Sequence, residues 1–94
     1  MRFEFTGKVW VWKGPAPWHF VTLPAKQSRD LKAILGLVTY GWGMVPVRAQ
    51  VGRTKWKTSM WYRDGRYVLP LKAAVRQAEK IKTGDKITVR LDVR

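Results

Sequence analysis

The residues whose types and spacing point most directly to chemistry are cations that alternate along one segment in the second half of the chain. From residue 53 to residue 61, alternate positions hold Arg53, Lys55, Lys57, Ser59 and Trp61. In a β-strand these side chains share one face and lie about 7 Å apart. Cations at that spacing suit the phosphates of a nucleic-acid backbone, and the indole can stack on a base.

Flanking residues extend this basic stripe. Arg48 shares a face with Gln50 in the preceding predicted strand, and Arg63 and Arg66 flank the next turn. One alternative stays open, since lysines on an exposed edge strand block sheet-to-sheet aggregation without binding a partner. We predict a nucleic-acid-binding site made of Arg48, Arg53, Lys55, Lys57, Trp61, Arg63 and Arg66.

A second candidate site surrounds the start of the second predicted helix. Lys72 and Arg76 are one helical turn apart, and a helix N-terminus with nearby cations favours anions. Like charges at this spacing also repel each other until an anion relieves them. With Trp56 they form a candidate Trp-lined pocket for an anionic ligand. The alternative is a structural role, in which both cations bond carbonyls or acids across the fold.

Residue types needed for catalysis or metal binding are scarce. The chain has no cysteine and one histidine, His19, so thiolate sites are excluded and a metal site would lack its usual ligands. Ser59 has no base held by an orienting acid. The carboxylates have structural explanations in turns and near helix ends. We therefore predict no enzymatic activity, no catalytic residue, no metal and no cofactor.

The net charge agrees with an anionic partner. The 94 residues include 19 Lys and Arg against 6 Asp and Glu, a formal net charge of +13. Such a charge attracts polyanions and opposes folding through self-repulsion. Residues 1–47 hold six basic and two acidic residues, whereas residues 48–94 hold thirteen and four. A charge that served solubility alone, which is the alternative, would not need this skew.

Composition also sets expectations for location and partners. The sequence has no signal-peptide core and no apolar run of about 20 residues, so we expect a cytoplasmic protein without a membrane partner. The expected partner is nucleic acid, DNA or RNA, and the expected state is a monomer or homodimer. The alternative function is a small-ligand or peptide-binding module that uses the Trp-lined anion pocket.

Turn residues divide the chain into six strands and two helices. We predict strands over residues 3–13, 18–23, 45–51, 54–62, 66–69 and 87–93, with the fifth strand ending at Pro70. Ser28 is the predicted cap of a helix that is ended by Gly41-Trp42-Gly43. Its apolar face would hold Leu31, Ile34, Leu35 and Val38. The second helix would bury Leu71, Ala74, Val75, Ala78 and Ile81.

The two halves share a pattern. Leu23-Pro24-Ala25-Lys26 matches Leu69-Pro70-Leu71-Lys72, and Val45–Val51 matches Ile87–Val93, with Trp10 and Trp56 as looser counterparts. One β-β-α-β unit of about 47 residues cannot bury its sheet alone. We therefore predict a mainly β (α+β) fold and one domain over residues 1–94. Two fused β-β-α-β units, about residues 1–47 and 48–94, would form a small double-split β-barrel with two short helices.

Two family resemblances follow from these motifs. Leu69-Pro70, a helix with Arg76, and Gly84-Asp85 resemble the swapped-hairpin unit of the AbrB and MazE transcription factors. In those proteins two chains interleave into a double-split β-barrel that binds DNA.

Nearly the whole chain also resembles the domain of unknown function 1905 family, which implies the same barrel and no established activity. Trp61-Tyr62 departs from the turn-like stretch of that family, which implies a longer hairpin here. The residues that carry the resemblance are Gly7-Lys8-Val9-Trp10, Trp18-His19-Phe20-Val21, Leu23-Pro24, Gly41-Trp42-Gly43, Val45-Pro46-Val47, Trp56-Lys57-Thr58-Ser59, Tyr67-Val68-Leu69-Pro70-Leu71-Lys72, Val75-Arg76 and Gly84-Asp85.

Overall fold

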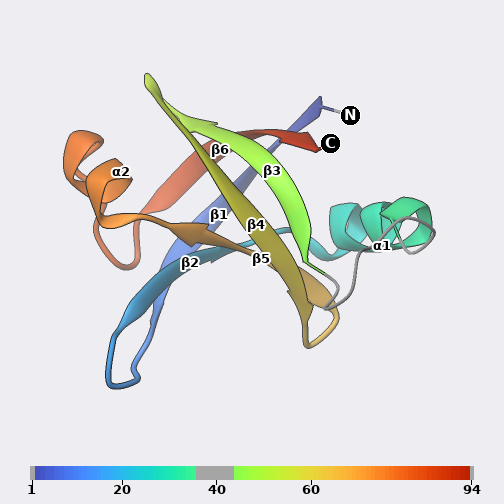
Figure 1. Cartoon of the computed structure of the whole chain (residues 1–94), viewed down its shortest axis with the longest axis horizontal. Coiled ribbons are helices and arrows are strands. Elements are labelled where there is room, and N and C mark those ends of the chain that lie inside the picture. The colour runs from blue at the N-terminus through green and yellow to red at the C-terminus, as the bar shows by residue number, and fades with distance from the viewer. Residues whose placement is uncertain (1, 36–43, 94) are drawn as a thin grey trace.

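The order of elements along the chain agrees with the sequence prediction. The structure, a computed structural model, describes residues 2–35 and 44–93. It contains β1 (Arg2–Trp12), β2 (Trp18–Thr22), α1 (Ala25–Leu35), β3 (Val45–Val51), β4 (Thr54–Arg63), β5 (Arg66–Leu71), α2 (Ala73–Ala78) and β6 (Lys86–Val93). The predicted order β-β-α-β-β-β-α-β is therefore confirmed (Figure 1). Val38 and Gly41-Trp42-Gly43 lie outside the described residues.

The strands close into an antiparallel barrel, as predicted. Their order around it is β1-β2-β5-β4-β3-β6, and the two helices lie outside the barrel on opposite sides (Figure 1). The fold is mainly β with two short helices. Neither described helix has the length and apolar character that crossing a membrane requires.

Two strands change partners partway along their length. β1 pairs with β6 from Arg2 to Lys8 and with β2 from Val9 to Trp12. β4 pairs with β3 from Thr54 to Met60 and with β5 from Trp61 to Arg63. The barrel therefore consists of two sheets that share β1 and β4. We call them the β3/β6 sheet and the β2/β5 sheet, and each has its own outer face.

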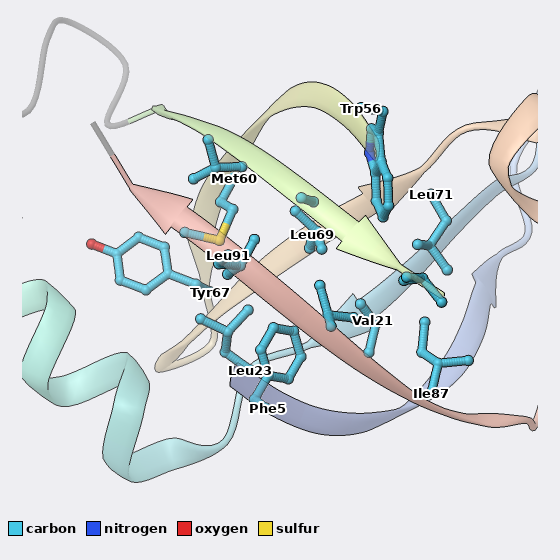
Figure 2. Close-up of a cluster of buried hydrophobic side chains, with 14 of the residues drawn as sticks. Phe5, Val21, Leu23, Trp56, Met60, Tyr67, Leu69, Leu71, Ile87 and Leu91 are labelled. Carbon is cyan, nitrogen blue, oxygen red and sulfur yellow. The ribbon is translucent and has the colours of Figure 1, made fainter. Parts of the chain in front are cut away.

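The barrel interior is filled by the inward-facing residues of all six strands. Figure 2 shows side chains such as Phe5, Val21, Met60 and Leu91 gathered there, and all four are almost completely buried. Burial alternates along β3 and β6 in particular, with period two. Because this period sends every second side chain outward, the core also determines which cations reach the surface.

The first helix differs from its predicted form. α1 begins at Ala25, directly after Pro24, so Ser28 lies inside the helix and is not its cap. The Ser28 hydroxyl is fully buried, accepts a hydrogen bond from the Tyr67 backbone N–H at 3.1 Å and lies 3.4 Å from the Leu23 carbonyl oxygen. It therefore joins α1 to β5. Ile34, predicted to be in the core, is 51% exposed, whereas Leu31 is buried.

The segment around Pro70 also corrects a prediction. β5 continues through Pro70 to Leu71, and α2 has only six residues. Pro70 has no backbone N–H to donate, yet it is tolerated in this strand because β5 pairs with β4 only as far as Val68. At Pro70 the neighbouring strand is β2, and the opposite edge of β5 is unpaired, so no ladder hydrogen bond is lost there. Leu71, Val75 and Ile81 are buried as predicted, but Ala74 and Ala78 are exposed.

Two tight turns join β3 to β4 and β4 to β5. Asp64 and Gly65 have positive φ angles of 52° and 82°, which is the type I′ pattern that matches strand twist. Gly52, with φ of 57°, starts the β3–β4 turn. Glycine is favoured there because other residues rarely adopt this conformation, and a Cβ atom at Gly52 would also displace the Glu79 carboxylate.

The pairing pattern is unchanged when the two halves of the chain are exchanged. Swapping β1 with β4, β2 with β5 and β3 with β6 gives the same order around the barrel. Ala49 pairs with Leu91. These two residues also occupy equivalent positions when Val45–Val51 is aligned with Ile87–Val93. Since Ala49 also pairs with Trp56 and Leu91 with Phe3, the counterpart of Trp56 is Phe3. The looser match of Trp56 with Trp10 is out of register.

Replacing Ser28 tests the contact between α1 and β5. Ser28→Ala leaves the buried Tyr67 N–H without an acceptor, so we expect the free energy of unfolding to fall by about 1–3 kcal/mol. Urea unfolding followed by tryptophan fluorescence measures this loss. Ala33→Ser is the matched control at an exposed position of the same helix, and its effect should not exceed about 0.5 kcal/mol. Equal losses in the two variants would contradict the role of Ser28.

Candidate nucleic-acid interface

The outer face of the β3/β6 sheet contains a groove of about 870 Å³. Two rows of outward side chains form its walls, and the backbone of the inward-facing residues between the rows forms its floor. One row runs across the four strands as Lys57, Arg48, Asp92 and Arg2. The other row runs as Lys55, Gln50, Arg90 and Glu4. We call this feature the basic groove.

The cations of the basic groove are unevenly paired. At the β1–β6 end, Arg2 Nε lies 3.6 Å from an Asp92 carboxylate oxygen, and Arg90 Nε lies 3.1 Å from a Glu4 carboxylate oxygen. At the β3–β4 end, none of the described carboxylates lies within ion-pair distance of the cations Arg48, Lys55 and Lys57. The uncompensated positive charge is therefore concentrated on the β3–β4 hairpin.

The hairpin brings like charges together. Arg48 and Lys57 are directly opposite each other on β3 and β4, and like charges in that position destabilise a sheet. Both side chains are exposed, so they remain available to an anion from solution. An anion placed between them would remove the repulsion, which makes this end of the groove the best position for a phosphate.

The turn of the hairpin is fixed from two sides. The Gln50 side-chain amide donates to the Gly52 carbonyl oxygen at 2.9 Å. The Thr54 hydroxyl donates to a Glu79 carboxylate oxygen at 2.6 Å, which joins β4 to the residue that follows α2. Arg53 is exposed at the tip of this turn, beside the hairpin residues that line the groove but not among the lining residues themselves.

The remaining residues of the predicted nucleic-acid site lie elsewhere. Trp61 pairs with Val68, and Arg63 pairs with Arg66, in the β2/β5 sheet. Arg63 also lies 3.7 Å from the Asp64 carboxylate. Because β4 changes partners after Met60, its outward residues begin in the basic groove and end on the other sheet. At about 3.3 Å per residue, the two ends of β4 are roughly 30 Å apart.

Sequence reasoning missed the β1–β6 half of the groove. Arg2, Glu4, Arg90 and Asp92 are far from the hairpin in sequence and reach it only through the β3–β6 and β1–β6 pairings. One signal for Arg90 was present, because the internal match equates Arg90 with Arg48. No comparable local signal pointed to Arg2 or to the two carboxylates that neutralise this end.

The residues of the predicted anion pocket come from β4 and from α2 with the residue before it, and these two elements are in contact at one end of the barrel (Figure 1). Trp56 faces inward and lies beside Leu71, as Figure 2 shows, while Lys72 is exposed just before α2. The indole Nε1 of Trp56 and the Nε of Arg76 are both buried and have no hydrogen-bond partner among the described residues. Since α2 has only six residues, its dipole contributes little to anion binding. An anion bound here would be held mainly by hydrogen bonds from the Trp56 and Arg76 side chains.

His19 belongs to the same end of the barrel. It pairs with Leu71 across β2 and β5, and its Nδ1 is also buried without a hydrogen-bond partner among the described residues. Burial, and secondarily the positive charge of Arg76, lower the pKa of His19 below its ordinary value of 6.5. Three buried nitrogen atoms, from β2, β4 and α2, therefore have no hydrogen-bond partner within the part of the chain that the structure describes. Within residues 2–35 and 44–93, no cluster of three acidic or histidine side chains could hold a metal ion.

Comparison with known proteins identifies a family. The family model described as "Domain of unknown function (DUF1905)" matches residues 5–91. The match includes the β3–β4 hairpin and α2, but it leaves out Arg2, Glu4 and Asp92 of the basic groove. No curated protein matches the chain.

The lowered pKa of His19 predicts a dependence of stability on pH. The unfolded chain takes up a proton near pH 6.5, whereas the folded chain does so only at lower pH. The free energy of unfolding should therefore decrease as pH falls below about 6.5, until pH passes the folded pKa. Urea midpoints at about pH 7.5 and about pH 5.5 measure the change. In His19→Gln this part of the change should be absent, and an undiminished pH dependence in that variant would contradict the assignment.

Proposed function

The chain belongs to the DUF1905 family, and we propose, from the geometry and charge of its surface, that it is a non-enzymatic nucleic-acid-binding module. Its β3–β4 hairpin contacts phosphates, mainly through charge. The observation that carries this proposal is the group of three cations at the hairpin end of the basic groove, Arg48, Lys55 and Lys57, none of which has a carboxylate partner among the described residues. Phosphate contacts of this kind position a nucleic acid without reading its sequence.

Two simpler explanations of these cations are less satisfactory. Protection of an open strand edge does not require them, because α2 packs against β4 and the Thr54–Glu79 hydrogen bond holds it there. Solubility alone does not require Arg48 and Lys57 to face each other, since a dispersed charge would avoid that repulsion. A polyanion accounts for both the position and the proximity of the charges.

We also propose that the barrel consists of two fused β-β-α-β units in a double-split arrangement. The partner changes of β1 and β4, and the pairing pattern that survives exchange of the two halves, support this proposal. One chain would then supply both units, where the resemblance to AbrB and MazE implies two chains. A monomer is sufficient for the proposed site.

The salt dependence of binding tests the proposed function. If Arg48, Arg53, Lys55 and Lys57 each neutralise one phosphate, log Kobs for duplex DNA should fall against log salt with a slope of about −3 to −4. Lys55→Gln with Lys57→Gln should make that slope shallower by about 2. Fluorescence anisotropy of a labelled duplex measures both slopes.

The matched control for this test removes the same amount of charge elsewhere. Lys13→Gln with Lys82→Gln changes two exposed lysines outside the groove and should leave the slope within about 0.5 of the wild-type value. Identical slopes in the hairpin and control variants would mean that total charge, and not the groove, governs binding.

A second candidate function has its own support. The buried donors of Trp56 and Arg76 have no acceptor among the described residues. They favour a small anionic ligand at the barrel end, since buried polar groups are rarely left unsatisfied. In a thermal-shift assay, inorganic phosphate or a small dicarboxylate at ten times its Kd should add about 1.4 kcal/mol and raise Tm by about 5–10 °C. Arg76→Gln should abolish the shift and Lys80→Gln should keep it. A shift that survives Arg76→Gln would reject this pocket.

A further inference from the structure

The outer face of the β2/β5 sheet is aromatic where a solvent-facing sheet is normally polar. Trp10 and Phe20 pair across β1 and β2, followed by Trp12 and Trp18. Trp61 extends the same cluster from β4, with its ring centroid 5.3 Å from that of Phe20. Antiparallel sheets usually carry polar residues on their exposed face, and an exposed aromatic patch of this kind marks a binding surface. We call it the aromatic face.

Phe20 shows that these rings form a cluster and are not isolated side chains. Its neighbour Val21 points into the barrel, so Phe20 points outward, and it is not part of the main core. It is nevertheless only 4% exposed, because the rings of Trp10 and Trp18 lie 4.9 Å and 6.2 Å from it. The aromatic face is therefore a packed layer on the outside of the barrel.

The outer rings of this layer are held in place and remain open to solvent. The Trp10 indole donates to the Thr22 hydroxyl at 2.8 Å, and the Arg63 guanidinium lies 5.9 Å from the Trp10 ring. Trp18 is stacked on Phe20 with an interplanar angle of 16°, yet Trp18 is 51% and Trp12 is 42% exposed. Planar surfaces fixed in this way bind flat partners with little loss of conformational entropy.

We infer that the aromatic face binds the unpaired bases of single-stranded nucleic acid, an inference that rests on the proposed function and specifies its substrate. Exposed indoles can stack on bases of any sequence. Arg63 and Arg66 border the face and supply cations for the adjoining phosphates. A second copy of this chain is a poorer occupant, because each copy carries a net charge of +13 and the two would repel each other.

β4 connects the two surfaces. By strand alternation its outward residues run from Lys55 and Lys57 in the basic groove to Trp61 and Arg63 on the aromatic face. A single strand that follows β4 would place phosphates on the lysines and bases on the rings. A duplex keeps its bases stacked inside and would gain only the phosphate contacts, so the protein should prefer single strands at equal salt.

Removing one stacking surface tests this inference. The probe is an oligothymidylate of about twelve nucleotides, long enough to reach both surfaces, and the readouts are anisotropy and quenching of tryptophan fluorescence. Trp18→Ala should weaken binding about 5- to 150-fold and leave the salt slope and the affinity for duplex DNA unchanged. Trp18→Tyr keeps an aromatic plane and should retain most of the affinity. Tyr62→Ala, at an exposed aromatic that contacts Tyr67 and Lys32 instead, should bind like wild type.

The outcomes separate this inference from the proposed function. If Trp18→Ala binds the oligothymidylate as tightly as wild type while Lys55→Gln with Lys57→Gln weakens it, base stacking is rejected and the phosphate site stands. If the wild-type protein binds neither the single strand nor the duplex at low salt, both fail. If sedimentation shows a dimer that Trp18→Ala converts to a monomer, the aromatic face is a contact between copies and the inference is overturned.

Discussion

The change of pairing partner along β1 and β4 is the constraint on which the rest of the structure depends. A barrel of six short strands has a small interior, and splitting two strands between sheets lets it close around the single cluster of aliphatic and aromatic side chains. The same change creates two outer faces with different surroundings. Because inward positions are reserved for the core, the residues between them are exposed whatever their type. The alternation of core residues therefore determines which positions are exposed, but not which residue types they hold. In this barrel the exposed positions hold cations on one sheet and aromatic rings on the other.

Local patterns in the sequence predicted the elements and half of the groove. Alternation of apolar residues in Val45–Val51 correctly placed Arg48 outward, and the turn residues at Gly52 and Asp64-Gly65 located both hairpins. These features depend on a few neighbouring residues, so they can be predicted without knowing the fold. Which residues share one surface is a non-local property. Trp61 was grouped with the stripe because it shares its alternation, and Arg63 because it flanks the next turn, but a change of neighbour at Met60 places both on the other sheet.

The prediction for Ser28 failed for another reason. Its residue type fits a helix cap, and helix starts are commonly recognised by such residues. Pro24 begins the helix one turn earlier, however, and the hydroxyl group instead satisfies a backbone N–H of a strand far away in sequence. Similarly, Arg2 and Arg90 became groove residues only through strand register. A hydrogen bond or an ion pair between distant segments has no signature in either segment alone, which is why the polar contacts of this protein were the least predictable part of it.

The exchange of strands that preserves the pairing pattern also interchanges the two walls of the basic groove. It places Glu4 where Lys57 stands and Asp92 where Gln50 stands, while Arg90 corresponds to Arg48 and Arg2 to Lys55. The two halves of the basic groove therefore differ in charge at two pairs of equivalent positions only, Glu4 with Lys57 and Asp92 with Gln50. If position 4 held lysine and position 92 held glutamine, the two halves would carry the same charges, and a polyanion could bind in either of two equivalent orientations related by half a turn. Glu4 and Asp92 remove that equivalence, so that the two directions in which a chain with distinct 5′ and 3′ ends could lie in the groove would differ in energy.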